Sequence, residues 1–184
     1  MIPSSDPRVD DSAVKQIINH VRQIPNYPQP GVIFKDITPV LEDPAAFAAL
    51  IEQLAAVANK PVDLVAGVEA RGFILGAPVA HALGAGFVPV RKAGKLPHEV
   101  VSQDYELEYG SATIEIHADA VKPGDRVLVV DDVLATGGTA RATCDLLTRL
   151  GAEVVTVAMM LEITALGGAA RLNDYDLVSL IIDN

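Results

Sequence analysis

The sequence predicts an open, doubly wound α/β fold, in which helices cover both faces of a mostly parallel sheet. Apolar runs such as residues 62–68 and 125–132 are rich in Val and Leu and lack polar alternation, which is typical of strands buried on both faces. Segments with helical spacing, at 73–83 and about 138–150, lie between such runs. With 184 residues, of which 50% are hydrophobic, we expect a single domain over residues 1–184 with a real core.

The N-terminal part is expected to contain two helices joined by an irregular connector. Apolar residues recur every three or four positions from Ser12, the expected N-cap, to Ile24. Prolines then make residues 25–39 an extended connector, interrupted by a short apolar "VIF". Asp43 is the expected N-cap of an Ala-rich helix that runs to about Asn59, with a proline in its first turn.

The remaining strands are short apolar runs separated by helices or loops. They are expected at residues 62–68, 86–90, 125–132, 153–161 and 177–182. Residues 92–118 depart from this order of strands and helices, because apolar and polar residues alternate in "ATIEIH", which follows a Gly-Ser turn. We expect a β-hairpin or long flap there, since long excursions within compact domains are usually functional lids or disordered loops.

Composition excludes several classes of protein. A net charge of −10 disfavours a nucleic-acid binder, which normally carries a basic face. The single cysteine, Cys144, excludes an internal disulfide framework, fits a reducing cytosol and is expected in the core. No apolar run approaches the length of a membrane span, and the polar N-terminus resembles neither a signal peptide nor an anchor. The histidines lack the spacing of a zinc site.

Three of the predicted strands end in residues unusual for a buried sheet. The first is followed by "EARG" (69–72), the second by Arg91 and Lys92, and the third ends in Asp131 and Asp132. Ligands of open α/β sheets bind beyond the carboxyl ends of the strands. The sequence therefore predicts one site at this edge of the sheet.

The loop after the paired aspartates is built from very small residues at the start of a helix. Backbone N–H groups converge in such a loop, and the helix N-terminus favours a phosphate. The loop lacks the Lys-Ser/Thr pair of a Walker A motif and the spacing of a dinucleotide fingerprint. On its own, it is equally well explained as a threonine-capped turn. Its residues are Ala135, Thr136, Gly137, Gly138 and Thr139.

The aspartates suggest what the loop binds. Successive strand residues point to opposite faces, but at the end of a strand the chain turns, and both carboxylates reach one ligand. Carboxylates accept hydrogen bonds from a vicinal ribose diol. Asp131 and Asp132 are also open to interpretation as metal ligands or as a solvated strand end. The combination with a phosphate loop favours a site for ribose 5-phosphate.

The segment "VLVVDDVLATGGT" (127–139) resembles the phosphoribosyl pyrophosphate motif of the type I phosphoribosyltransferases. "PGVIFKDITPVL", "GVEARGFILGAPVA", "VPVRKAGKLP" and "YELEYG" occur in the order of the branch of that family that acts on adenine. The match extends over about residues 20–170. It implies the open parallel-sheet fold of this family, with an N-terminal hood over about residues 1–35, a core over 36–184 and a β-hairpin flap over 95–117.

The resemblance also assigns roles to residues. Asp131 and Asp132 would hold the ribose hydroxyls, directly or through the water shell of a magnesium ion, and the loop 135–139 would hold the 5-phosphate. The peptide before the residue at position 70 is often cis in this family. The pyrophosphate-binding residues would be Ala70, Arg71, Arg91, Lys92 and Lys95, and the catalytic residues Glu108, Tyr109 and Arg71.

Adenine would bind beneath the hood. Phe34 would stack on the purine, backbone groups of Ile33 and Lys35 would meet its 6-amino edge, and Ile163 would pack on the other face. Without the resemblance, Phe34 is better explained as an ordinary core aromatic, and Glu108 equally well as an exposed hairpin carboxylate.

The implied reaction transfers ribose 5-phosphate from phosphoribosyl pyrophosphate to N9 of adenine, giving AMP and pyrophosphate. Mg²⁺ would arrive with the substrate, since it is usually shared between substrate phosphates and one or two carboxylates. The resemblance further implies a cytoplasmic homodimer without nucleic-acid or membrane partners. Two alternatives stay open: an enzyme for xanthine or another purine, and a non-catalytic regulator that senses phosphoribosyl pyrophosphate.

Overall fold

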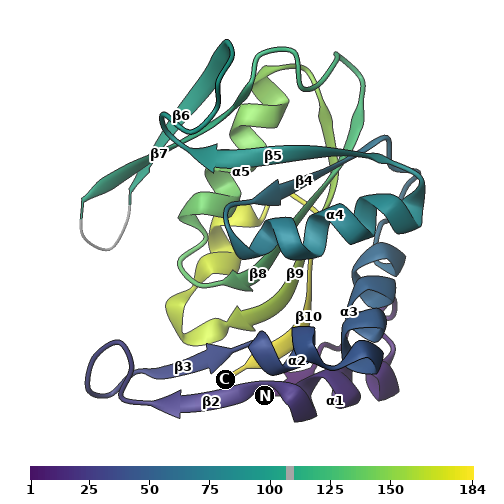
Figure 1. The fold of residues 1–184 in the computed structure, drawn as a ribbon, viewed down its shortest axis with the longest axis vertical. Helices are drawn as coiled ribbons and strands as arrows, with labels where there is room; N and C mark the ends of the chain where they lie inside the picture. Colours follow the sequence, from purple (N-terminus) through teal and green to yellow (C-terminus); the bar gives the residue numbers. More distant parts are fainter. Residues whose placement is uncertain (107–109) are drawn as a thin grey trace.

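The computed structural model describes residues 1–106 and 110–184. Its main sheet has the strand order β1-β10-β9-β8-β4-β5-β7-β6, and the central strands run parallel (Figure 1). This confirms the predicted α/β fold. The parallel strands are β4 (Leu64–Val68), β5 (Gly86–Lys92), β8 (Arg126–Leu134), β9 (Glu153–Ile163) and β10 (Leu177–Asp183).

Antiparallel strands close both edges of the sheet. The short β1 (Ile2–Pro3) pairs with β10 at one edge. At the other edge, β7 (Ser111–His117) pairs with the end of β5, and β6 (Val100–Glu106) pairs along β7. The predicted hairpin is thus confirmed over its two strands, while residues 107–109 lie outside the described part of the chain.

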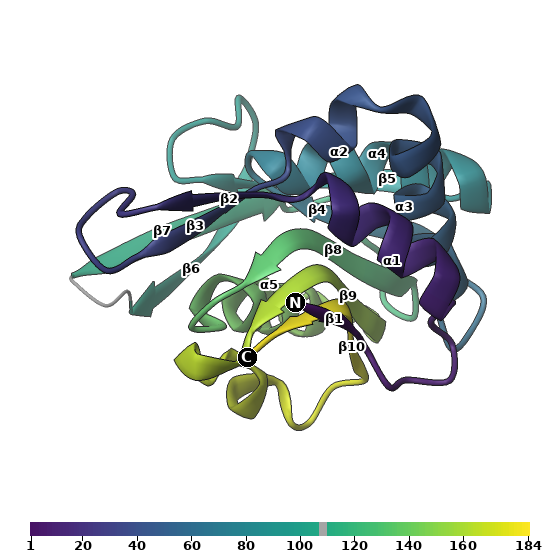
Figure 2. The ribbon, with the colours of Figure 1, turned by 90° about the horizontal axis from the view of Figure 1, so that it is seen from below.

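Helices cover both faces of the sheet, and none of those described is long and apolar enough to cross a membrane. In Figure 2, α1 to α4 form one group above β8, and α5 lies below it. The helices are α1 (Asp11–His20), α2 (Thr38–Glu42), α3 (Pro44–Ala56), α4 (Arg71–Leu83) and α5 (Gly138–Arg149), followed by the 3₁₀ turns η1 (Thr164–Leu166) and η2 (Gly168–Leu172).

The parallel strands bury side chains on both faces, as their unbroken apolar runs predict. In β4, Val65 packs into a core with α1 to α4, whereas its neighbour Ala66 packs into a second core with α5. In β8, Leu128 and Val129 divide in the same way between the two cores. Each face of the sheet therefore holds its own layer of helices, and the edge where the strands end is left for the site.

The first helix differs from the prediction at both ends. Asp10, not Ser12, is the N-cap, because the Asp10 carboxylate accepts hydrogen bonds from the backbone N–H groups of Ser12 (2.8 Å) and Ala13 (3.2 Å). The helix ends at His20, since Val21 adopts extended dihedrals. Residues predicted to continue the helix instead enter a new strand.

The predicted irregular connector contains a β-hairpin. Strand β2 (Arg22–Pro25) pairs antiparallel with β3 (Ile33–Asp36) and forms a separate two-stranded sheet. Prolines at its turn and the short apolar run concealed this pairing in the sequence. In Figures 1 and 2, this hairpin and the β6–β7 hairpin project on the same side of the molecule.

Other boundaries shift by a few residues. Asp43 caps α3 as predicted, accepting a hydrogen bond from the Ala46 N–H (2.8 Å), but the helix ends at Ala56 rather than near Asn59. Helix α4 begins two residues earlier than predicted. Strand β8 continues to Leu134 rather than ending at residue 132, because it stays paired with β9 over this stretch.

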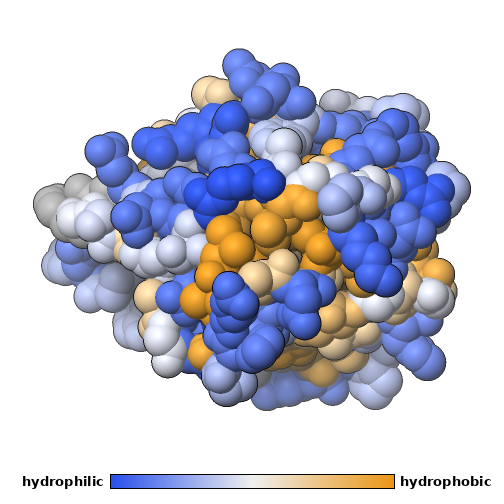
Figure 3. Space-filling model, turned by 90° about the horizontal axis from the view of Figure 1, so that it is seen from above, coloured by the Kyte–Doolittle hydropathy of each residue, from blue (hydrophilic) through white to orange (hydrophobic). Residues whose placement is uncertain are grey.

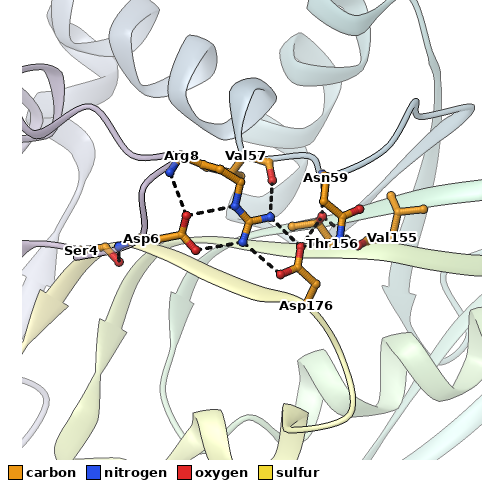
Figure 4. Close-up of polar contacts among 8 residues, drawn as sticks. All are labelled: Ser4, Asp6, Arg8, Val57, Asn59, Val155, Thr156 and Asp176. Atoms are coloured by element: carbon orange, nitrogen blue, oxygen red, sulfur yellow. Dashed lines mark hydrogen bonds and ion pairs between the residues drawn. The ribbon is translucent and has the colours of Figure 1, made fainter.

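The N-terminal segment is fixed to the sheet by Arg8 (Figure 4). Its guanidinium donates two hydrogen bonds to Asp6 (3.0 and 2.9 Å) and two to Asp176 (2.7 and 3.0 Å). It donates a further bond to the carbonyl oxygen of Val57 (3.0 Å). Asp176 also accepts a bond from Thr156 Oγ1 in β9 (3.0 Å). One arginine therefore joins the N-terminal segment, the end of α3 and the start of β10.

Candidate active site

A cavity of about 420 Å³ opens where β4, β5 and β8 end. It brings together the three strand ends that the sequence singled out. The predicted site residues that line it are Ala70, Arg71, Lys92, Asp131, Asp132, Ala135 and Thr139. A smaller hollow of about 90 Å³ adjoins it, lined by the whole loop 135–139 and by Asp131.

The paired aspartates lie inside β8, not at its end as predicted. Asp131 pairs in register with Met159 of β9, and the strand continues beyond Asp132. Both residues still line the cavity. The Asp131 carboxylate accepts a hydrogen bond from the Asp132 backbone N–H (2.9 Å), and Asp132 Oδ2 lies 2.7 Å from Arg71 Nε.

The two carboxylates differ from exposed aspartates in their electrostatics. Burial raises the pKa of the Asp131 carboxyl well above its ordinary value, and the neighbouring Asp132 carboxylate raises it further. Asp132 Oδ2 is buried and, among the described residues, has no hydrogen bond of good geometry despite its contact with Arg71. Such an oxygen is suited to accept a hydrogen bond from a bound hydroxyl.

The loop 135–139 has the geometry of an anion site. Gly137 has a positive φ of 78°, which glycine adopts without strain, and α5 begins at the next residue. No side chain caps this helix N-terminus, so its backbone N–H groups are free to bind a ligand.

A second glycine supports this loop from outside. A Cβ on Gly137 would lie 2.5 Å from the Gly168 carbonyl oxygen, and a Cβ on Gly168 would lie 2.9 Å from Gly137 N and overlap the Ala135 carbonyl oxygen. The two main chains therefore touch with no room for a side chain at either position. The sequence shows Gly168 only as one glycine of a pair near the C-terminus.

Glu69 organises the positive charges beside the cavity. Its carboxylate binds Lys95 Nζ, Arg91 Nε (3.3 Å) and the Lys92 backbone N–H (3.2 Å). The hydrogen bond from Lys95, together with those from Lys92 and Arg91, lowers the pKa of Glu69 to about 2. The structure thus places the side chains of Arg91 and Lys95 on Glu69, while Lys92 lines the cavity.

The sequence analysis gave Glu69 no role, although it immediately precedes the predicted pyrophosphate-binding pair. An acid next to a group of predicted anion-binding residues was the available signal. The Glu69–Ala70 peptide is cis, as the resemblance implied.

Phe34 of β3 lies next to Arg71, which lines the cavity. The Arg71 guanidinium carbon lies 5.8 Å from the centroid of the Phe34 ring, within reach of a cation–π contact. The Tyr27 ring meets the Phe34 ring edge-on at 5.3 Å. The described lining of the cavity includes neither Phe34 nor Ile163, so these two predicted base-binding residues are not part of the cavity wall.

The flanking predicted residues take different positions. Ile33 is exposed, whereas the Lys35 side chain is buried, and Ile163 is the last residue of β9. Glu108 and Tyr109 lie outside the described residues. Tyr105, a residue of β6, lines the cavity and carried no prediction.

The described residues offer few groups that could bind a metal ion or act as a reactive thiol. Among the described residues, no three or more His, Cys, Asp or Glu side chains are grouped to hold a metal ion. Cys144 is buried in the core, as expected, and burial raises the pKa of its thiol to about 12.

Comparison with known proteins identifies the family. Residues 38–184 match the model of the phosphoribosyl transferase domain. The chain is 59% identical to an adenine phosphoribosyltransferase of Thermobifida fusca over 165 residues, which cover 89% of this chain and 94% of that protein. It is 60% identical to one of Streptomyces coelicolor over 157 residues, covering 85% and 86% of the two chains.

Solved structures agree with this assignment. Adenine phosphoribosyltransferase from Thermoanaerobacter pseudethanolicus superposes with a TM-score of 0.89 at 51% identity, covering 92% of this chain and 99% of the other. The enzyme from Saccharomyces cerevisiae, solved with adenine and an imino-altritol bisphosphate, gives 0.86 at 38% identity, covering 92% and 98%. The carboxylate pair within β8 and the glycine loop that follows this strand thus occur in a chain that belongs to the type I phosphoribosyltransferases and, within them, to the adenine phosphoribosyltransferases.

Proposed function

We propose that this enzyme transfers ribose 5-phosphate from phosphoribosyl pyrophosphate to N9 of adenine, giving AMP and pyrophosphate, a reaction of purine salvage. The single observation that carries the proposal is the cavity in which two carboxylates, a free helix N-terminus and Arg71 meet. The yeast relative was solved with adenine and a sugar bisphosphate analogue, which supports a purine and a phosphorylated sugar as ligands here.

In this proposal, β8 and the loop after it hold the donor. Asp131 and Asp132 accept hydrogen bonds from the 2- and 3-hydroxyls of the ribose. The loop 135–139 and the N-terminus of α5 bind the 5-phosphate through backbone N–H groups and threonine hydroxyls. Because the hydroxyls and the 5-phosphate are both bound, the position of C1, the reacting carbon, is fixed.

The leaving group is bound on the other side of C1. Ala70, Arg71 and Lys92 contact pyrophosphate from the cavity wall, and Arg91 and Lys95 add positive charge from their positions on Glu69. As the bond from C1 to pyrophosphate breaks, positive charge develops on the ribose and negative charge on the leaving group. The cations stabilise that negative charge.

The base is held under the β2–β3 hairpin. Phe34 stacks on one face of adenine and Ile163 packs on the other, while backbone groups of Ile33 and Lys35 read the 6-amino edge. N9 then attacks C1 and forms the glycosidic bond of AMP. Glu108, with Tyr109, assists the movement of the proton on the base, and the flap that carries them excludes water.

A magnesium ion would accompany the donor. The buried Asp132 oxygen without a well-made hydrogen bond suits an ion or its water shell, but two carboxylates are too few for a site built by the protein alone. Asp131 and Asp132 would hold Mg²⁺ directly or through water. When bound, the ion neutralises charge on the pyrophosphate.

We also propose a homodimer that works in the cytoplasm. Figure 3 shows an apolar area ringed by hydrophilic residues on the upper side of the molecule, and exposed apolar patches of this kind mark contact surfaces. The free buried Cys144 suits a reducing compartment. Sedimentation equilibrium at several concentrations tests the dimer.

A base-specificity assay tests the proposed reaction. With Mg²⁺ and phosphoribosyl pyrophosphate, the purified protein should convert adenine to AMP much faster than it converts hypoxanthine, guanine, xanthine or orotate. Preference for another purine would support the alternative purine enzyme and refute the choice of adenine. Binding of the donor without turnover of any base would indicate a regulator.

A further inference from the structure

The side chain of Lys35 is buried between the β2–β3 hairpin and the end of β10. Its side chain is 7% exposed, and its Nζ lies 2.9 Å from Asp183 Oδ2 and 3.1 Å from Asp183 Oδ1. Nζ also donates a hydrogen bond to Gln23 Oε1 across the hairpin (3.2 Å). The ammonium group therefore joins the small sheet to the main sheet.

A buried ammonium group is an unusual way to hold a hairpin in place. Lysine is almost never fully buried unless it is paired, because an unpaired charge in the interior is costly. The pair is also directional, since Nζ must meet both the Asp183 carboxylate and Gln23 to be satisfied. The ion pair therefore favours one position of β3 relative to β10, whereas an apolar contact would allow the two strands to shift along each other.

The pair connects the two proposed walls of the adenine site. Successive residues of a strand point to opposite faces, so Phe34 points away from the face on which Lys35 is anchored. Asp183 pairs in register with Ile163 on the neighbouring strand β9. The ion pair thus joins the neighbour of Phe34 to the neighbour of Ile163.

The Asp183 end of the pair is itself held firmly. Its carbonyl oxygen accepts a hydrogen bond from Thr164 Oγ1 (3.1 Å), and Thr164 follows Ile163 directly in the chain. A shift of Lys35 relative to Asp183 would therefore change the distance of Phe34 from Ile163, and not simply move the whole site.

We propose that Lys35 and Asp183 are positioning residues that set the separation between Phe34 and Ile163 and thereby the affinity for adenine. This inference rests on the proposed function of Phe34 and Ile163 as the base site. It assigns the Lys35 side chain a role distinct from that of its backbone. It also extends the base site to β10, which none of the sequence motifs includes.

The variant Lys35→Met tests the proposal, since it keeps the aliphatic stem and removes the charge. We expect the KM for adenine to rise about tenfold, because a displaced Phe34 ring stacks less well on the base. The KM for phosphoribosyl pyrophosphate should change far less, since the described partners of Lys35 Nζ, Gln23 and Asp183, are not among the residues proposed to bind the donor. Asp183 also lies 3.7 Å from the Met1 amino nitrogen, so Lys35 is the cleaner residue to replace.

Lys60→Met is the matched control. Lys60 forms an ion pair with Glu153, but that pair is about half exposed (53% and 49%) and lies at the beginning of β9, at the end remote from Ile163. Neither KM should change in this variant. A rise in the adenine KM equal to that of Lys35→Met would overturn the proposal.

Other outcomes are equally decisive. If Lys35→Met raises both KM values together, or neither, the pair does not position the base. If that variant fails to fold, Asp183→Asn, which preserves shape, should show the same selective rise for adenine, and its absence overturns the proposal. A wild-type protein that does not use adenine refutes the proposed function instead, so the two failures are distinguishable.

Discussion

Arg71 Nε lies 2.7 Å from Asp132 Oδ2, and the same guanidinium lies against the ring of Phe34. One cation on the first turn of α4 thus contacts the carboxylate proposed for the ribose and the ring proposed for the base. Binding of pyrophosphate to Arg71 would draw it away from Asp132 and free that carboxylate for the sugar. Arg71 therefore lies between the residues proposed for the donor and the ring proposed for the base.

Asp132→Asn should impair use of the sugar donor. The change keeps the size of the side chain but removes a charge buried beside Arg71, so we expect kcat/KM for phosphoribosyl pyrophosphate to fall about 100-fold, equivalent to ~3 kcal/mol. Steady-state kinetics with each substrate varied in turn would measure it. Asp145→Asn, on α5 in a partly exposed pair with Arg141, is the control and should retain activity. Equal losses in both variants would contradict a specific role of Asp132.

Glu69→Gln should weaken the binding of the pyrophosphate group of the donor. The amide loses the charge that binds Lys95 and Arg91, so these two side chains are less well ordered, and we expect the KM for the donor to rise about tenfold, or ~1.4 kcal/mol. Because the pKa of Glu69 is lowered to about 2, this carboxylate stays ionised at every pH near neutrality. The ratio of variant to wild-type activity should therefore be flat from mildly acidic to mildly basic pH, and a slope would show that another group is responsible.

Phe34→Ala should mainly weaken the binding of adenine. Stacking of a base on an aromatic ring is worth about 1–3 kcal/mol, so we expect the KM for adenine to rise about tenfold while the KM for the donor changes little. Phe34→Tyr keeps the ring and should behave like the wild type. Unchanged adenine kinetics in Phe34→Ala would mean that the hairpin β2–β3 does not hold the base.

Gly168→Ala should damage the phosphate loop from outside the cavity. The added methyl group would overlap the Ala135 carbonyl oxygen, so the loop must shift, and the KM for the donor should rise at least about tenfold. Gly167→Ala is the control. Gly167 has nothing within 4 Å of its would-be Cβ, although its φ of +67° adds some strain. An effect of Gly167→Ala as large as that of Gly168→Ala would attribute the loss to backbone strain and not to the contact.

Arg8→Met should destabilise the fold without changing the residues of the candidate active site. Loss of the charged hydrogen bonds to Asp6 and Asp176 should lower the free energy of unfolding by about 2 kcal/mol and the Tm by roughly 4–8 °C. Thermal denaturation followed by circular dichroism would measure the change. Lys15→Met, which breaks the exposed pair with Asp11, should shift Tm very little.

The effect of Arg8 should also depend on pH. Its hydrogen bonds hold the pKa of Asp6 and the pKa of Asp176 below their ordinary value. For such groups the stabilisation is fully present above the unfolded pKa, near ~3.9, and is lost as the pH falls through the lowered folded pKa. The stability difference between wild type and Arg8→Met should therefore shrink below about pH 4. A difference that persists unchanged in acid would show that Asp6 and Asp176 are not its source.

The sheet could be predicted because its signals are local and strong. Unbroken apolar runs marked each parallel strand, and Asp43 marked the beginning of α3. Strand ends were less predictable, because β8 continues through Asp131 and Asp132 only by pairing with β9, which no local pattern reveals. The β2–β3 hairpin was missed for a related reason, since its apolar run is short and is set among prolines.

The candidate site could be predicted in part. Asp131, Asp132 and the loop 135–139 form one contiguous motif, and their convergence with Arg71 follows from the parallel sheet. Contacts between distant parts of the chain carried no local signal. Lys35 with Asp183, separated by 148 residues, and Gly137 with Gly168 are recognisable only once the chain is folded.

The contact between Gly137 and Gly168 limits how this enzyme can be recombined with its relatives. The conformation of the phosphate loop depends on residues outside the loop, because the main chain at the start of η2 packs directly against it. A chimaera that imports residues 135–139 alone would place a foreign loop against an unmatched surface. The transferable unit is discontinuous, and comprises the loop together with the turn around Gly168.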